Sequence, residues 1–499
     1  MASATRPLHS LMVWGCTSHA GKSLLATALC RWAARQGLRV APFKAQNMSN
    51  NARVVARADG GFGEIGSAQY LQALAARCAP DVHMNPVLLK PWRDTASQVV
   101  LQGRVAPGLA DLPWRERSRW LAEVAHESFQ QLPSRFDRLV IEGAGSPAEI
   151  NLAASDYVNL GAARWAVAAG SLQALLVADI DRGGAFAHLF GTWQMLPDDL
   201  RGHLSGHVLN QFRGDASLLA PGPELLQQRT GVPVVGVLPM WREHGLPDED
   251  GLFNAAPSGG AHDLQISVLA LPHISNLDEF APLRRVPGLN LRWVRSVAEL
   301  AGSDWIILPG SKQVSGDLAW LRAQGLDAAV ALHVLAGRRL LGICGGLQML
   351  GQRLNDPQGH DGQRVQDLPG LGHLPLYTEF GLDKRLLAAS LRFGACHGPW
   401  SGLAGVSAQG YEIRCGQTWL ADDAGPDVAT ALMDDHGAPI GWQRANVLGL
   451  YAHGLFESAP VLQALFGVQV PTLDTVFDGL ADFIEEHIGP ARLRALLLA

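Results

Sequence analysis

A repeated alternation of short apolar runs with longer amphipathic segments constrains the fold of this chain more than any other feature. The apolar runs of the first half that are typical of buried strands are Leu11–Cys16, Leu38–Phe43, Leu139–Glu142, Ala174–Asp179, His207–Phe212 and Val232–Leu238. Helix-like segments such as Lys22–Gln36 and Glu64–Ala76 lie between them. Because wholly apolar strands must be covered on both faces, the alternation predicts a doubly wound α/β domain with a parallel sheet over residues 1–250.

The same alternation restarts after a polar interruption. Residues 251–263 are rich in Gly, Pro and acidic side chains and are typical of a linker. The apolar runs that follow are Leu264–Leu271, Leu289–Val294, Trp305–Leu308, Arg339–Cys344 and Val447–Tyr451. They predict a second doubly wound α/β domain over residues 264–465. Residues 466–499 form a C-terminal extension, in which Leu473–Ala499 has helical apolar spacing, and we expect it to cap this second domain.

Composition excludes several classes of partner. Of the 499 residues 47% are hydrophobic, which is ample for large cores, and the net charge of −6 gives no basic excess for binding nucleic acid. The six Cys show no CxxC spacing, so we expect neither a zinc site nor a disulfide framework. The N-terminus lacks the apolar core of a signal peptide, and no apolar run has the length of a membrane span. We therefore expect a cytoplasmic protein without a membrane partner.

The segment Gly15–Ser23 has the context of a phosphate-binding loop. It follows an apolar run and opens a predicted helix, so that backbone N–H groups and the helix N-terminus can face a phosphate. Lys22 is expected to reach the outer phosphates and Ser23 to contact Mg²⁺. Five residues separate Gly15 from Gly21 instead of the usual four, a spacing that resembles dethiobiotin-synthetase-like proteins. The alternative is a Gly-rich turn that binds nothing.

Mg²⁺ also needs carboxylate oxygens. Glu142 ends a predicted strand, where a charge points into the crevice in which such sheets bind ligands. Asp59, in the turn before Glu64, is a second candidate. For each of them the alternative is a solvated loop acid.

A second motif, Gly342–Gly346, predicts a nucleophile. An apolar strand runs into Gly-x-Cys-x-Gly and a helix follows, which is the strand–turn–helix elbow with Cys344 at its apex. The helix N-terminus favours a thiolate. The alternative is a buried structural Cys.

A nucleophilic Cys needs a base, and His453, just past a predicted strand, is the best candidate among the His residues. The backbone N–H groups of Gly310 and Gly345 could form an oxyanion hole. A phosphate loop and a thiol elbow on one chain indicate ATP-driven activation of a carboxylate and release of ammonia from an amide.

The order of motifs resembles one family closely. The series GKS, KAQNMSNN, EIGSAQ, MNPVLLKP, IEGAGSPAEINL, DIDRGGAFA, NQFRGD, LPHISN, LPGSK, GICGGLQMLG, GYEIRCG and YAHGLFE spans about Leu11 to Glu457. It is similar to that of the cobyric acid synthases, the glutamine-dependent amidotransferases of cobalamin biosynthesis. The resemblance implies amidation of a corrinoid, adenosylcobyrinic acid a,c-diamide, at its b, d, e and g carboxylates, with one glutamine and one ATP for each amide.

The resemblance also implies roles for individual residues. Cys344 would be the glutaminase nucleophile and His453 its base. The nucleotide-binding residues would be Gly15, Thr17, Gly21, Lys22 and Ser23, with Mg²⁺ contacts from Ser23, Asp59 and Glu142. Lys44, Gln46 and Asn47 match a motif expected near the phosphates and the substrate carboxylate, and Asp181 and Arg182 match one expected near the corrinoid.

Two departures and two alternatives accompany this interpretation. Triad glutaminases carry a Glu two residues after the His, where this chain has Leu455, so the group that orients His453 is open, with Glu457 as one candidate. Gln211 replaces the usual Lys of the NQFRGD motif.

The nearest alternative is a related amidotransferase such as cobyrinic acid a,c-diamide synthase. The other is a nucleotide-switch ATPase with an inactive glutaminase-like domain.

Overall fold

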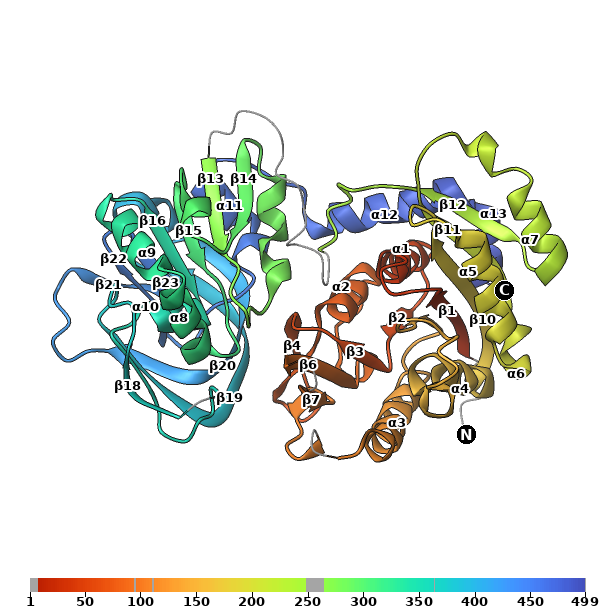
Figure 1. Cartoon of the computed structure of the whole chain (residues 1–499), viewed down its shortest axis with the longest axis horizontal. Coiled ribbons are helices and arrows are strands. Elements are labelled where there is room, and N and C mark those ends of the chain that lie inside the picture. The colour runs from red at the N-terminus through yellow and green to blue at the C-terminus, as the bar shows by residue number, and fades with distance from the viewer. Residues whose placement is uncertain (1–7, 94–95, 110–111, 248–263, 363, 499) are drawn as a thin grey trace. The chain divides into compact units, whose positions relative to one another are not determined.

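The computed structural model describes residues 8–93, 96–109, 112–247, 264–362 and 364–498, which form two compact units (Figure 1). The first unit comprises Met1–Ser49, Val55–Leu246 and Leu473–Ala499, and the second comprises Asn50–Val54 and Pro247–Thr472. The chain therefore enters the second unit twice, because the short segment Asn50–Val54 is flanked in sequence by the first unit. The predicted linker, 251–263, lies outside the described residues.

A parallel sheet forms the centre of the first unit. Its strands, in spatial order, are β12 (Val234–Pro239), β11 (Leu204–Phe212), β10 (Gly170–Asp179), β1 (Leu8–Gly15), β9 (Arg138–Glu142) and β2 (Val40–Phe43). All neighbouring pairs are parallel. These strands begin and end within four residues of the predicted apolar runs. Their carboxyl ends therefore meet at one edge of the sheet, the edge to which the sequence assigns the phosphate site.

Helices cover both faces of this sheet, which confirms the doubly wound prediction. On β1, Leu11 and Val13 point into one apolar core while Met12 and Trp14 point into another, as expected for a strand buried on both sides. The first core is completed by α1 (Lys22–Arg35), α2 (Ser67–Ala75), α12 (Leu473–Ile488) and α13 (Pro490–Leu497). The second is completed by α3 (Trp114–Gln131), α4 (Ala162–Ala169), α5 (Ala185–Met195), α6 (Asp198–Arg201) and α7 (Gly222–Thr230).

The expectation that the C-terminal helices cap the second domain is wrong, because α12 and α13 belong to the first unit. The apolar stripe of α12 packs in the core that α1 shares. The fully buried Arg31 of α1 pairs with Asp478 of α12 at 2.8 Å, and the Trp32 indole donates to Glu485 at 2.7 Å. Helical periodicity predicts an apolar face but does not identify the helix or sheet that covers it. Here Arg31 and Trp32 of α1 bind acidic side chains of α12.

Small sheets accompany the central one in the first part of the chain. One contains β3 (Gln46–Met48), β6 (Val87–Arg93), β7 (Ala96–Leu101) and β8 (Arg104–Val105), and another pairs β4 (Ala52–Ala56) with β5 (Phe62–Gly66). The predicted helix Glu64–Ala76 therefore begins only at Ser67. Glu64 lies on β5 instead, where its buried carboxylate pairs with Lys90 of β6 at 2.8 Å. The EIGSAQ and MNPVLLKP motifs each contribute one residue to this buried ion pair, so Glu64 and Lys90 have a structural role.

The second unit is built on a mixed sheet. Its parallel part runs β14 (Leu289–Val294), β13 (Leu264–Leu269), β15 (Trp305–Leu308), β16 (Arg339–Ile343) and β23 (Val447–Leu450), all within two residues of the predicted runs. The sheet continues, mostly antiparallel, through β22 (Pro439–Arg444), β21 (Val428–Met433), β19 (Leu376–Phe393), β17 (Arg353–Asp356) and β18 (Val365–Pro369), and β20 (Ser407–Leu420) pairs with β19 off this path. The helices α8 (Val314–Ala323), α9 (Leu326–Leu335), α10 (Gly345–Leu350) and α11 (Ala459–Phe466) complete the unit.

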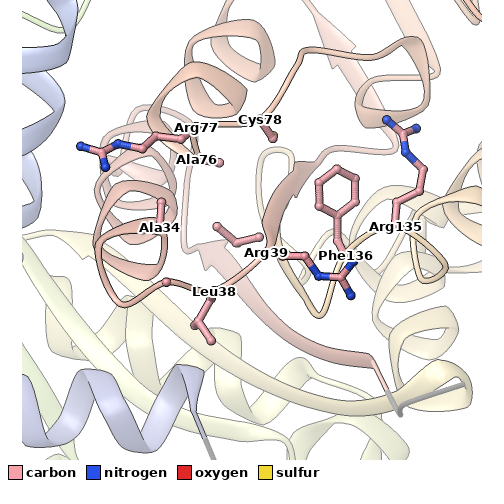
Figure 2. Close-up of a pocket in the computed structure, with 10 residues that line it drawn as sticks. Ala34, Leu38, Arg39, Ala76, Arg77, Cys78, Arg135 and Phe136 are labelled. Atoms are coloured by element: carbon pink, nitrogen blue, oxygen red, sulfur yellow. The ribbon is translucent and has the colours of Figure 1, made fainter.

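A pocket in the first unit lies away from the predicted phosphate site (Figure 2). It is lined by Leu38 and Arg39, which precede β2, and by Arg135 and Phe136, which precede β9. These are the amino ends of parallel strands, whereas the phosphate loop follows the carboxyl end of β1. Among the described residues, no helix combines the length and apolar character needed to cross a membrane.

Candidate active site

Cys344 occupies a strained turn between β16 and α10. Its φ of 52° and ψ of −106° lie in a region that L-residues rarely adopt. The flanking glycines allow the turn: a Cβ on Gly342 would lie 2.5 Å from the Leu350 side chain, and one on Gly346 would lie 2.0 Å from the Leu308 carbonyl oxygen. The geometry is that of the predicted elbow, which holds the thiol at the start of a helix.

His453 and a buried carboxylate face this thiol. The His453 Nδ1 lies 3.0 Å from Glu279 Oε1, and the two side chains are only 1% and 0% exposed. Because a carboxylate can only accept, Nδ1 carries the proton and Nε2 is left for the thiol. Burial alone would lower the pKa of His453, but the charge of Glu279 and the hydrogen bond with Cys344 raise it. This arrangement favours the protonated form of the His453 imidazole beside the thiol.

Glu279 is a candidate site residue that the sequence patterns did not predict. It lies in the 3₁₀ segment η7 (Leu277–Arg285), and its carboxylate also accepts from the Gly454 N–H at 3.3 Å. The alternative candidate, Glu457, pairs with Arg53 instead. The available signal was the acidic pair Asp278-Glu279, which follows the LPHISN motif after one intervening residue.

The loop after β15 lies against both catalytic side chains. A Cβ on Gly310 would lie 3.0 Å from His453 Cε1, and one on Gly345 would lie 2.7 Å from the Ser311 nitrogen. Asp317 fixes the loop, since its buried carboxylate accepts from the Ser311 hydroxyl at 2.6 Å. Gly310 and Gly345 are thus brought together beside the thiol, as the oxyanion-hole prediction requires.

The phosphate loop joins β1 to α1 as predicted. Gly21 has φ 99°, and a Cβ there would lie 2.0 Å from Asn210 Nδ2, so both conformation and space require glycine. The Lys22 ammonium lies close to Gly15, where a Cβ would be 2.8 Å from its nitrogen, and it donates to the Thr17 carbonyl at 2.9 Å. Burial lowers the pKa of Lys22 to about 8, although Glu142 opposes that change. The loop therefore holds a desolvated cation where phosphate oxygens are expected.

Glu142 gathers a second set of predicted residues at the end of β9. Its Oε1 accepts from Ser23 at 2.9 Å and from Lys44 at 2.8 Å, and Oε2 accepts from Gln72 at 2.5 Å. Burial raises the pKa of Glu142, but the charge and hydrogen bond of Lys44 outweigh it and keep the carboxyl ionised. A hydroxyl and a carboxylate side by side are hard oxygen donors that suit Mg²⁺ bound mainly through nucleotide and water.

Asp59 does not join this cluster. It is 43% exposed on the turn between β4 and β5, where it pairs with Arg57 and Arg104. The sequence prediction that it contacts Mg²⁺ is not supported, because its environment is that of a solvated loop acid. Within the part of the chain that the structure describes, no cluster of three or more His, Cys, Asp or Glu could hold a metal ion.

The residues predicted near the substrate fall into two groups. Gln46 accepts a hydrogen bond from the Tyr157 hydroxyl, and Asn47 is buried near Gly66. Asp181 and Arg182 follow β10 but do not pair with each other. Asp181 contacts Arg213 of the NQFRGD motif, and Arg182 pairs with Asp179 at 2.9 Å. The Arg182 side chain remains 58% exposed and free to meet a ligand from solvent.

Two glutamines of α2 were not predicted as site residues. Gln72 holds Glu142, and Gln69, one turn earlier on α2, is fully buried with no hydrogen-bond partner for its side-chain amide. Gln69 belongs to the EIGSAQ motif, which was the only sequence signal. Gln211, in place of Lys, donates to the His19 carbonyl at 3.3 Å and so holds the phosphate loop from β11.

Comparisons with known proteins agree with this division. Residues 11–245 match the CobQ/CobB/MinD/ParA nucleotide binding domain, and residues 265–461 match the CobB/CobQ-like glutamine amidotransferase domain. A solved structure entitled "Crystal structure of glutamine amidotransferase" aligns with 41% of this chain and 99% of its own, at 23% identity and a TM-score of 0.32.

Curated relatives match along almost the whole chain. The cobyric acid synthase of Methylibium petroleiphilum is 59% identical over 498 residues, which cover 98% of this chain and 97% of the relative. The cobyric acid synthase of Leptothrix cholodnii is 59% identical over 504 residues, which cover 98% of this chain and 97% of the relative. The chain therefore belongs to the cobyric acid synthase family of glutamine-dependent amidoligases, with an N-terminal nucleotide-binding domain and a C-terminal glutamine amidotransferase domain.

Proposed function

We propose that this protein converts adenosylcobyrinic acid a,c-diamide to adenosylcobyric acid by amidating the b, d, e and g carboxylates. Each amide uses one ATP and one glutamine. The observation that carries the proposal is the buried Cys344–His453–Glu279 array, on the same chain as a phosphate loop whose Lys22 and Ser23 lie beside the buried Glu142. The name of the relatives, cobyric acid synthase, supports the choice of product.

In the glutaminase site, His453 Nε2 accepts the thiol proton and the Cys344 thiolate attacks the side-chain amide carbon of glutamine. The backbone N–H groups of Gly310 and Gly345 stabilise the oxyanion of the tetrahedral intermediate. The His453 imidazolium then protonates the leaving ammonia, and water hydrolyses the thioester to glutamate. Glu279 holds the imidazole in the required tautomer throughout.

In the synthetase site, a carboxylate of the substrate attacks the γ-phosphorus of ATP, which forms an acyl phosphate and releases ADP. Ammonia then attacks the acyl carbon, and inorganic phosphate leaves as the amide forms. Lys22 and Lys44 neutralise charge on the transferred group. Ser23 and Glu142 would hold Mg²⁺, which supplies further charge neutralisation on the nucleotide phosphates. Glu142 also orients Lys44, because the two are paired and buried together.

The corrinoid would meet the loops after β2, β9 and β10. Gln46 and Asn47 lie on the short strand β3 that follows the first of these loops, and Asp181 and Arg182 lie in the last. Arg182 is positioned to pair with a carboxylate arm that is not being processed. Loops of this kind suit a substrate whose arms must be presented one after another.

The two alternatives make different products. A cobyrinic acid a,c-diamide synthase would stop after one or two amides. A nucleotide switch would not hydrolyse glutamine, and a complete Cys–His–Glu array with a strained nucleophile gives no support to an inactive domain.

Replacing the nucleophile should separate the two half-reactions. We expect Cys344→Ala to abolish glutamine-dependent amidation while amidation driven by an ammonium salt persists, because the thiol serves only to release ammonia. Both rates are measured by mass spectrometry of the corrinoid. A glutamine-driven rate equal to that of the unaltered protein would show that Cys344 is not the nucleophile.

Removing the charge behind the histidine tests the newly found third member. We expect Glu279→Gln to lower kcat for glutamine hydrolysis by about two to four orders of magnitude, since the tautomer and the imidazolium lose their support. Because Glu279 raises the pKa of His453, its loss should lower that pKa. The alkaline limb of the pH–rate profile should therefore move to lower pH. Glu485→Gln, on α12 of the first unit, is the control, and an unshifted profile in Glu279→Gln would contradict the assignment.

The phosphate loop should be needed whatever the source of ammonia. We expect Lys22→Ala to lower amidation by about two to three orders of magnitude with glutamine and with ammonium alike, because it removes a transition-state charge contact. Glutamine hydrolysis by Cys344 need not fall in parallel. Retained activity with ammonium would exclude Lys22 from phosphoryl transfer.

The number of amides added tests the substrate. We expect a time course with diamide, Mg-ATP and glutamine to show partly amidated corrinoids before the product with four new amides. Arg182→Ala should raise the KM for corrinoid more than that for ATP or glutamine. A reaction that ends after one or two amides would favour the diamide synthase.

A further inference from the structure

The segment Asn50–Val54 belongs to the second unit although the residues on both sides belong to the first. It follows the KAQNM residues of the predicted synthetase site directly. Its polar groups bind two loops of the second unit: the Ala52 N–H donates to Asn276 Oδ1 at 3.2 Å, the Leu277 N–H donates to Asn51 Oδ1 at 2.8 Å, and the Lys312 ammonium donates to Asn50. One of these loops leads into Glu279, and the other contains Gly310.

Arg53 extends from this segment into the interior of the second unit, where its side chain is only 3% exposed. One terminal nitrogen pairs with Glu457 at 2.6 Å and the other pairs with Asp278. Asp278 directly precedes Glu279, and Glu457 closes the short turn that follows His453. A single guanidinium thus ties together the two backbone segments that carry the catalytic base and its carboxylate partner.

Tyr411 provides a second connection between Arg53 and His453. The guanidinium lies 5.1 Å from the centroid of the Tyr411 ring, and the same ring stacks on the His453 imidazole with centroids 5.4 Å apart and planes inclined by 22°. Backbone hydrogen bonds of 2.9 and 3.3 Å also join Tyr411 to His453. Arg53 therefore restrains the imidazole through an aromatic ring as well as through the acidic pair.

We propose that Asn50–Val54 completes the glutaminase site and that Arg53 is a positioning residue for His453 and Glu279. The inference rests on the proposed glutaminase function of Cys344. It means that glutamine hydrolysis in this chain needs a piece of the N-terminal half of the sequence, outside the residues that match the amidotransferase domain. Arg53 touches neither Cys344 nor any reacting atom in this scheme, and acts only by holding the residues that do.

The chemistry of the site requires arginine rather than any cation. A planar guanidinium can pair with two carboxylates through different nitrogens while its face lies on an aromatic ring. A lysine ammonium can neutralise charge but cannot bridge the same two acids in one fixed plane. Without the cation, Asp278 and Glu457 would be left as uncompensated acids beside Glu279, and the His453–Glu279 geometry would relax.

The test compares Arg53→Ala and Arg53→Lys with a matched control, Arg353→Ala. Arg353 lies in the same unit, pairs with Asp367 at 2.8 Å and lies 5.9 Å from the Tyr377 ring centroid, but it is on the surface. Glutamine hydrolysis, ammonium-driven amidation and the rate at which iodoacetamide alkylates the Cys344 peptide are measured on the full chain. Displacing catalytic groups by about an ångström costs on the order of 10²-fold in rate.

We expect Arg53→Ala to lower kcat for glutamine hydrolysis by about 10²-fold and to slow Cys344 alkylation, with a smaller change in KM. Arg53→Lys should recover part of this loss, and ammonium-driven amidation should stay within about twofold of the unaltered protein in both variants. Arg353→Ala should change none of the three rates.

Two results would overturn the proposal. One is unaltered glutamine hydrolysis in both Arg53 variants. The other is an equal loss of glutamine-driven and ammonium-driven amidation in both, which would mark a general structural role. The proposed glutaminase role of Cys344 is tested separately, because it fails if the unaltered protein does not hydrolyse glutamine or if Cys344→Ala still does.

Discussion

A carboxylate cannot remain charged in an apolar interior unless cations or hydrogen-bond donors surround it, and both sites of this protein are organised around such acids. Glu142 sits fully buried at the end of β9, and its ionised form holds Ser23, Lys44 and Gln72 within hydrogen-bonding distance. Glu279 does the same for His453 in the second unit. In each case the acid fixes the groups that would meet the substrate, so the position of the functional side chains follows from the need to compensate one buried charge.

Close backbone approach is the second constraint on the glutaminase site. A methyl group on Gly346 would lie 2.0 Å from the Leu308 carbonyl oxygen, so the start of α10 can lie against the end of β15 only because no side chain intervenes. That contact brings the loop with Gly310 beside Cys344. The positive φ of Cys344 is the conformational cost of holding its thiol at this junction.

Local patterns predicted the parts of the structure that local sequence determines. The phosphate loop, the elbow and the parallel strands follow from glycine spacing and apolar runs, and the parallel strands of the structure begin and end within four residues of the predicted runs. Glu279 was not predictable in the same way, because it lies 174 residues from His453 and only the folded chain brings them together. The association of α12 with α1 is a similar case, since an apolar helical stripe does not reveal its partner. The contact of Asp59 with Mg²⁺ stays a prediction, and in the structure Arg57 and Arg104 pair with that carboxylate on an exposed turn.

Lys44 and Arg53 lie close together in the sequence but belong to different units. Lys44 pairs with Glu142 in the synthetase site, and nine residues later Arg53 pairs with Asp278 and Glu457 in the second unit. The intervening stretch is short, and Ser49 is hydrogen-bonded to Leu89 at 3.0 Å. Such a stretch can span only a short distance, because an extended chain spans about 3.3–3.6 Å for each residue. Lys44 and Arg53 therefore lie on one short stretch of sequence, of which the residues up to Ser49 belong to the first unit and Asn50–Val54 belong to the second.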